Sequence, residues 1–136
     1  MKRLIYGTGL LIAMACPHLY AQTLYAVANV PFDFQMDNTR MPAGKYVVKE
    51  SGGLLLVRGA SGPKTAAAHL TFPVSRSARS SHAKLQFNRY GDEYFLAAIW
   101  DANSHGGHAL TKGQHEKELA SRHVFVQTAS ISLQEK

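Results

Sequence analysis

The chain has almost no cysteine: Cys16 is the only one among 136 residues, and it lies in the apolar N-terminal stretch. We predict that this stretch is cleaved after Ala21, which leaves residues 22–136 without a thiol. A chain without thiols forms no disulfide, has no cysteine nucleophile and cannot ligate a metal through sulfur. The mature protein is therefore expected to fold and act without cysteine chemistry.

Long hydrophobic runs are also lacking, because crossing a bilayer takes about 20 apolar residues. The longest candidate, over residues 4–16, follows two basic residues and precedes the small residue Ala21. This layout is typical of a secretory signal over residues 1–21. We therefore predict an exported protein, periplasmic or secreted, with no transmembrane span in the mature chain. Two alternatives stay open: an uncleaved N-terminal anchor, and a lipoprotein carrying its lipid on Cys16, although Ala13 stands where such signals normally have Leu.

The basic residues outnumber the acidic ones but form no dense stripe. The full chain has a net charge of +6, and loss of Lys2 and Arg3 leaves 13 basic and 9 acidic residues, a charge of +4. A nucleic-acid interface needs a denser stripe and an element that reads a groove. We therefore predict no nucleic acid among the partners. A mild positive balance favours solubility and attraction to anionic surfaces.

Most of the chain alternates apolar and polar residues with the period of two that is typical of β-strands. The pattern is clearest over residues 24–36, where Pro31 marks an edge or a bend between two strands. A Gly-Asp turn between residues 84–90 and 93–100 predicts a tight hairpin, and we place its second strand at the centre of the core. The expected pairs are Arg89 with Tyr94, Phe87 with Leu96 and Leu85 with Ala98.

The remaining segments complete a single domain over residues 22–136. Further strands are expected over residues 45–50, 54–58, 65–72 and 124–133, irregular loops over 73–82 and 101–108, and a helix over about 112–122. Thr111 and Gln114 have the spacing of a capping box at the start of that helix. We predict an all-β fold, a single antiparallel sandwich or small barrel of about 6–8 strands, with one short C-terminal surface helix.

Several stretches resemble a pattern of small exported acidobacterial β-rich proteins. They are residues 30–34 (VPFDF), 41–48 (MPAGKYVV), 87–96 (FNRYGDEYFL) and 116–120 (EKELA). The resemblance covers most of the mature chain. It implies an export signal and a compact β domain, but it implies no activity and transfers no catalytic residue.

One cluster contains residue types that ligate metals. His105, His108 and His115 lie within a short span, and Glu116 follows the last of them. Two imidazoles and a carboxylate can hold zinc or iron. The three histidines are therefore candidate metal ligands, while unrelated polar residues on a Gly-rich surface are the alternative. We predict no bound cofactor.

Catalytic patterns are missing. The carboxylates Asp33, Asp92, Glu93 and Asp101 are spread along the chain, and nothing in the sequence places two of them together. Acid–base catalysis needs two groups with different pKa values in one site. No Gly-x-Ser-x-Gly elbow presents a nucleophilic serine. We therefore predict that the protein is not an enzyme.

Aromatic residues give the remaining signal for binding. Tyr25, Arg89 and Tyr90 are candidate surface-binding residues, because we expect both tyrosines to be exposed and Arg89 to lie beside the ring of Tyr94. The sequence favours an exported, non-enzymatic binding or structural module of the cell envelope or extracellular space, with a protein or envelope component as partner. The alternative is a carrier of a small ligand or metal, whose cavity would be lined by Phe32, Phe34, Phe87 and Trp100.

Overall fold

The computed structural model describes residues 24–60, 65–122 and 125–135. In chain order the elements are β1 (Leu24–Val30), β2 (Phe34–Met36), β3 (Thr39–Met41), β4 (Gly44–Ser51), β5 (Leu54–Gly59), β6 (Ala66–Ser80), β7 (Lys84–Tyr90), β8 (Glu93–Trp100), β9 (Ser104–Leu110), α1 (Gln114–Arg122), β10 (Gln127–Ser132) and β11 (Gln134–Glu135). The predicted all-β class with one short helix is confirmed, although the 11 strands exceed the expected 6–8.

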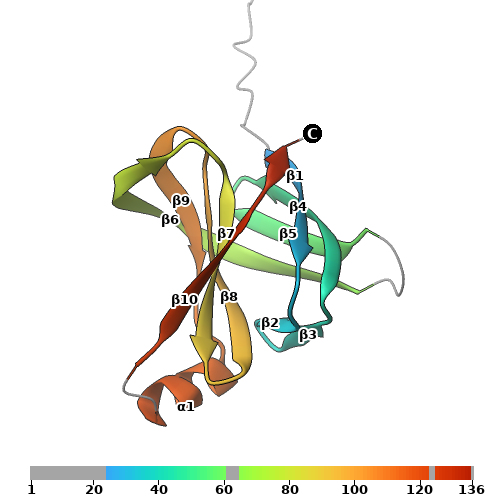
Figure 1. Cartoon of the computed structure of the whole chain (residues 1–136), viewed down its shortest axis with the longest axis vertical. Helices are drawn as coiled ribbons and strands as arrows, with labels where there is room; N and C mark the ends of the chain where they lie inside the picture. The colour runs from blue at the N-terminus through green and yellow to red at the C-terminus, as the bar shows by residue number, and fades with distance from the viewer. Residues whose placement is uncertain (1–23, 61–64, 123–124, 136) are drawn as a thin grey trace, which may run out of the picture.

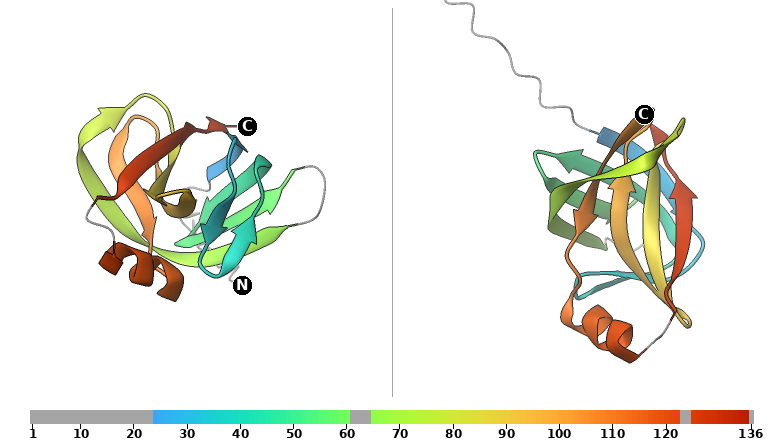
Figure 2. Two further views of the ribbon diagram at one scale, coloured as in Figure 1. Left: turned by 60° about the horizontal axis from the view of Figure 1, so that its bottom comes forward. Right: turned by 90° about the vertical axis from the view of Figure 1, so that its left-hand side faces the viewer.

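The strands form one mixed sheet that is not closed into a barrel. Its main path runs β10-β7-β8-β9-β6-β5-β4-β1-β11, and among the described strands only the pairing of β2 with β8 is parallel. The sheet curls so that β1, β4 and β5 lie opposite β7, β8 and β10 (Figures 1 and 2). The long strand β6 belongs to both halves, because its first part pairs with β5 and its second part with β9.

The hydrophobic core lies between the two halves of the curled sheet. Ala26, Val48 and Val57 enter it from β1, β4 and β5, while Leu85 and Ile99 enter it from β7 and β8. Successive side chains of a strand point to opposite faces. The core therefore uses one face of β1, β4 and β5 and leaves the outer face of these strands for other roles.

The predicted loop over residues 73–82 is wrong for most of its length, because β6 continues to Ser80. This second part of β6 pairs with β9. Pro73 has no N–H to donate, but the ladder to β5 ends at Leu70, so only one side of the strand needs pairing there. The Ser-rich composition gave no indication of a strand, and its partner β9 falls in the second predicted loop, over residues 101–108.

The predicted Gly-rich loop over residues 101–108 is also wrong, since β9 begins at Ser104. A Cβ atom on Gly107 would lie 2.5 Å from Cε3 of Trp100 and 2.6 Å from the carbonyl oxygen of Ile99. Glycine therefore lets β9 pass close to the indole ring, where any side chain would clash. The glycine marks close packing inside a strand rather than a flexible loop.

The predicted hairpin between β7 and β8 is largely confirmed. Gly91 has a φ of 62° at the first turn position, where glycine adopts this conformation without strain. Two of the expected pairs are present, Arg89 with Tyr94 and Phe87 with Leu96. An irregularity next to Gln86 then shifts the register, so Leu85 pairs with Ile99 instead of Ala98. The shift places Ile99 in the core and Trp100 on the other face.

Helix α1 agrees with the predicted helix except at its start. The carbonyl of Gly113 accepts the first helical hydrogen bond, from the N–H of Lys117 at 3.0 Å, so the helix starts after Gly113 rather than at Lys112. The helix lies beyond one end of β7 and β8 (Figure 2). Within the described ranges, no helix is long and apolar enough to cross a membrane.

Candidate functional site

The structure corrects the prediction that Tyr90 is exposed. Tyr90 is only 2% exposed, and its hydroxyl donates to Oε2 of Glu116 at 3.0 Å. The amide of Asn88 donates to the same oxygen at 3.3 Å. Burial and the Glu116 carboxylate raise the pKa of Tyr90 to about 12. Tyr90 therefore fastens α1 to the β7–β8 hairpin and presents no ring to a partner.

The other two surface candidates do reach solvent, on different halves of the sheet. Arg89 on β7 lies over the ring of Tyr94, with its guanidinium carbon 5.4 Å from the ring centroid, as expected. One nitrogen of Arg89 is 4.0 Å from a carboxylate oxygen of Asp92. Tyr25 on β1 is 37% exposed. Of the three candidates, Tyr25 and Arg89 are thus accessible, and they do not share a strand pair.

The three candidate metal ligands contact three different partners. Nδ1 of His105 lies 3.0 Å from the carbonyl oxygen of Arg76. Nε2 of His108 lies 3.7 Å from a carboxylate oxygen of Glu50, and Nε2 of His115 lies 2.9 Å from a carboxylate oxygen of Glu93. Among the residues that the structure describes, no group of three or more His, Cys, Asp or Glu side chains could hold a metal ion. Closeness in sequence does not bring these histidines together, because two lie on β9 and one on α1.

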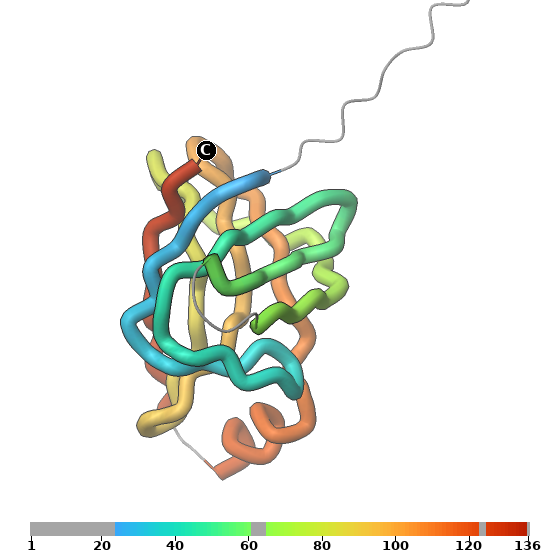
Figure 3. Tube along the Cα trace, turned by 90° about the vertical axis from the view of Figure 1, so that its right-hand side faces the viewer, coloured from blue at the N-terminus to red at the C-terminus, as the bar shows by residue number. Residues whose placement is uncertain are grey.

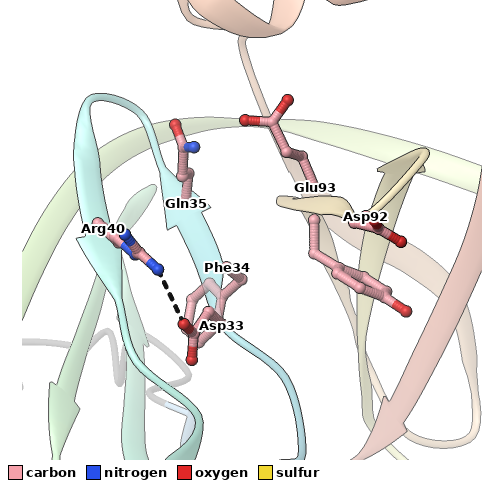
Figure 4. Close-up of a pocket in the computed structure, with 7 residues that line it drawn as sticks. Asp33, Phe34, Gln35, Arg40, Asp92 and Glu93 are labelled. Atoms are coloured by element: carbon pink, nitrogen blue, oxygen red, sulfur yellow. Dashed lines mark hydrogen bonds and ion pairs between the residues drawn. The ribbon is translucent and has the colours of Figure 1, made fainter.

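Three of the four scattered carboxylates line one polar cleft, which sequence spacing did not indicate. The cleft holds about 200 Å³ and is lined by Asp33, Phe34, Gln35, Arg40, Asp92, Glu93 and Tyr94. Arg40 and Asp33 stand on one wall, with Asp92 and Glu93 on the other (Figure 4). The walls come together because Gln35 of β2 pairs with Phe95 of β8, a contact between distant parts of the chain.

All three carboxylates of this cleft already have partners in the protein: Arg89 for Asp92, His115 for Glu93, and two donors for Asp33. Asp33 accepts hydrogen bonds from the backbone N–H of Ala43 at 2.8 Å and from the guanidinium of Arg40 at 3.1 Å. These two contacts lower the pKa of Asp33 below its ordinary value. A general acid at neutral pH needs a raised pKa. The cleft therefore gives no support to acid–base catalysis, and its contacts tie the loops together.

Aromatic rings pack against one another where the carrier hypothesis needs a cavity. The ring of Phe32 stacks on Tyr94 with centroids 3.8 Å apart and meets Phe87 edge-on at 5.0 Å. Trp100 lies apart from them, with the guanidinium carbon of Arg76 4.6 Å from its ring centroid. These contacts do not support a ligand cavity lined by the predicted rings.

The outer face of β1, β4, β5 and β6 gathers exposed apolar side chains. The strand register places the outward-facing residues of these strands in rows: Tyr25–Lys49–Leu56–Ala68, Val27–Val47–Arg58–Ala66, and Leu54–Leu70, with Phe72 two residues further along β6. Val27 is the buried member of these rows. We call this surface the basic–apolar face. Leu70 is 72% exposed, Leu54 46% and Phe72 45%. Neighbouring exposed apolar side chains of this size are typical of an interaction surface.

The charged side chains of the basic–apolar face all have one sign. Lys49 and Arg58 are exposed on it. In β1, β4, β5 and β6, all of which the structure describes, the single carboxylate is Glu50, which pairs with the buried Leu55 and therefore points inward. Glu50 accepts a hydrogen bond from the N–H of Gly53 at 3.0 Å. The face is thus complementary to a partner that is apolar and negatively charged.

A hollow of about 460 Å³ adjoins the basic–apolar face near the ends of β5 and β6. It is lined by Val47, Arg58, Gly59, Ala60, Thr65 and Ala66. The small alanine side chain on β6 leaves this depression open, and Arg58 places a guanidinium at it. Sequence reasoning found Tyr25 but missed the rest of the face. The signal was present in the run Leu54–Leu56, where apolar residues occupy both faces of one strand.

Comparison with protein-family models, with curated proteins and with solved structures finds no match for this chain. The resemblance to small exported acidobacterial proteins therefore stays a prediction.

Proposed function

We propose that the protein is an exported, non-enzymatic binding module that engages its partner through the basic–apolar face. The observation that carries this proposal is the exposure of Leu54, Leu70 and Phe72 side by side, on strands whose only carboxylate points inward. An exposed leucine in isolation is common, but adjacent exposed apolar side chains mark contact surfaces. The predicted secretory signal supports a partner at the cell envelope or outside the cell.

Binding is favoured over catalysis because carboxylates of the polar cleft, where the structure gathers candidate catalytic groups, have partners within the protein. Asp33 is held as a carboxylate by Arg40, and Glu93 contacts His115. Leu70 on the basic–apolar face, by contrast, leaves most of its side chain exposed to solvent. The groups available to a second molecule are therefore apolar and cationic ones, which suit recognition.

The test measures how much of the purified protein remains bound to isolated envelopes of its host after washing. We expect the double variant Leu70→Thr/Phe72→Thr to bind much less than the wild type. The matched control is Phe125→Thr, which removes an exposed aromatic ring that precedes β10. Equal retention of the wild type and the double variant would refute the basic–apolar face as the binding surface.

A further inference from the structure

We infer that the partner of the basic–apolar face is an anionic lipid surface, an inference that rests on the proposed function. The apolar and cationic side chains of the basic–apolar face follow one another in a fixed order along the strands. Leu54 and its neighbour Leu70 lie next to the β4–β5 turn, Lys49 lies one row further from that turn, and Arg58 lies one row beyond Lys49. Figure 3 shows this turn at the periphery of the molecule.

The spacing of these rows fits the layers of a bilayer. Strands rise about 3.4 Å per residue, so Lys49 lies roughly 7 Å and Arg58 roughly 14 Å from the row of Leu54. The headgroup region on each side of a bilayer is roughly 5–7 Å thick. When the strands stand along the membrane normal and the leucines reach the hydrocarbon, Lys49 lies among the headgroups. Arg58 then lies just outside them, at a distance where the attraction of anionic lipids still acts.

A second copy of the chain is a poorer occupant of the same face. In a two-fold dimer the same patch meets itself. Lys49 and Arg58 of one copy would then approach Lys49 and Arg58 of the other, and the strands of the face offer no outward carboxylate to compensate them. Like charges brought together across an interface are unfavourable. A lipid surface instead supplies many mobile phosphate groups.

The experiment measures partition of the chain, as purified from its host, onto vesicles by co-sedimentation. We expect binding to phosphatidylglycerol vesicles and much weaker binding to phosphatidylcholine vesicles, with a decrease as salt is raised. Leu70→Thr should weaken binding to the anionic vesicles about tenfold, because a leucine side chain contributes at least this much when it leaves water. Lys49→Gln should weaken it about fivefold, the equivalent of about 1 kcal/mol for one charge near the surface.

The matched control separates the face from the general positive charge of the chain. Lys117→Gln removes the same charge from an exposed position on α1. Residues 1–23 are identical in all variants, so any contribution from them cancels. We expect Lys117→Gln to bind as the wild type does. Equal losses for Lys49→Gln and Lys117→Gln would overturn the inference, since they would show attraction without a defined face.

The two proposals fail in distinguishable ways. If the chain ignores anionic vesicles but Leu70→Thr/Phe72→Thr still loses binding to envelopes, the lipid inference is wrong and the face binds a protein or another envelope component. If the purified chain forms dimers that Leu70→Thr dissociates, the occupant is a second copy and the inference is again wrong. If neither vesicles nor envelopes distinguish the face variants from the wild type, both proposals fall. The unfolding midpoint of each variant shows whether the fold is intact.

Discussion

Replacing Gly107 with alanine adds one methyl group where β9 passes over β8. The new Cβ would lie 2.5 Å from Cε3 of Trp100 and 2.6 Å from the carbonyl oxygen of Ile99. Favourable contacts between non-bonded carbon atoms begin at about 3.5 Å. The carbonyl belongs to the backbone of a strand paired on both sides, so it cannot turn away. The ring of Trp100 is confined by the guanidinium of Arg76 above it.

The expected loss of stability follows from these contacts. Extra methyl groups in packed regions cost about 1–3 kcal/mol, and an alanine offsets about 0.4–1 kcal/mol of this by restricting the unfolded chain. Because one of the two clashes is with backbone, we place the cost in the upper part of its range. Gly107→Ala should therefore lower the free energy of unfolding by about 2 kcal/mol. For a chain of this size the melting temperature should fall by about 10 °C.

Urea denaturation followed by tryptophan fluorescence measures this loss, since Trp100 is the only tryptophan of the chain and lies at the perturbed contact. The control is Gly106→Ala on the neighbouring residue of β9. A Cβ there would meet only Oγ of Ser104 at 3.3 Å and a carboxylate oxygen of Asp101 at 3.7 Å. We expect Gly106→Ala to change the free energy of unfolding by about 0.5 kcal/mol or less. Equal losses in the two variants would refute the close-packing explanation of Gly107.

Three further predictions concern the hydrogen bonds of Tyr90 and Asp33 and their dependence on pH. Tyr90→Phe should lower the free energy of unfolding by about 1–3 kcal/mol, because it leaves a buried carboxylate oxygen of Glu116 without the hydroxyl donor of Tyr90. Urea denaturation measures this loss, and Tyr94→Phe is the control. Since the folded pKa of Tyr90 is raised from 10.0 to about 12, its stabilising effect is complete below pH 10 and is lost as the pH rises through 12. Urea midpoints of wild type measured across that window should fall faster than those of Tyr90→Phe, and parallel curves would contradict the assignment. The pKa of Asp33 is lowered from 3.8, so its contribution to stability is present above pH 3.8 and is lost as the pH falls through the lower, folded value. In acid titrations followed by circular dichroism, Asp33→Asn should lose less stability over this range than the wild type. An unchanged profile would argue against the contacts of Asp33 with Ala43 and Arg40.

Local patterns were sufficient to predict the elements that depend on their own residues. The alternation before and after Pro31 indicated two strands separated by a bend, as observed in β1 and β2. The Gly-Asp turn fixed the start of the β7–β8 register because glycine at its first position accepts a positive φ. Beyond the irregularity at Gln86 the register depends on packing, and there the predicted pairing of Leu85 was wrong.

The second half of β6 and the strand β9 could not be predicted because they are rich in serine and glycine, and pairing makes them strands: β6 with β9, and β9 with both β6 and β8. Ser75 pairs with Gly106 and Val74 with Gly107, and of these four residues only the valine itself favours a strand. The polar docking of α1 was hidden for a similar reason. With few apolar residues, the helix gave no indication that its buried side chain would be Glu116, which finds two donors on β7.

The cleft at Asp33 and the basic–apolar face differ in how far each could be predicted from the sequence. The cleft exists because Gln35 pairs with Phe95, and no local pattern reports such a contact. The face follows from strand register alone. Once β1, β4 and β5 are aligned, the positions of Tyr25, Lys49 and Arg58 on one side can be derived, so a correct pairing of these three strands with β6 would have revealed the face.

Stability does not explain why leucines occupy the paired positions 54 and 70. A cross-strand pair contributes about 0.2–1 kcal/mol, and pairs of threonine reach similar values without exposing apolar surface. Leu70→Thr should therefore change the free energy of unfolding by about 0.5 kcal/mol or less, because Leu70 is 72% exposed and buries little of its side chain in the fold. The same variant should lose most of its binding to envelopes. Urea denaturation and the envelope assay on one sample separate the two effects: a large loss of stability would mean that Leu70 serves the fold, whereas lost binding with unchanged stability would mean that it serves the partner.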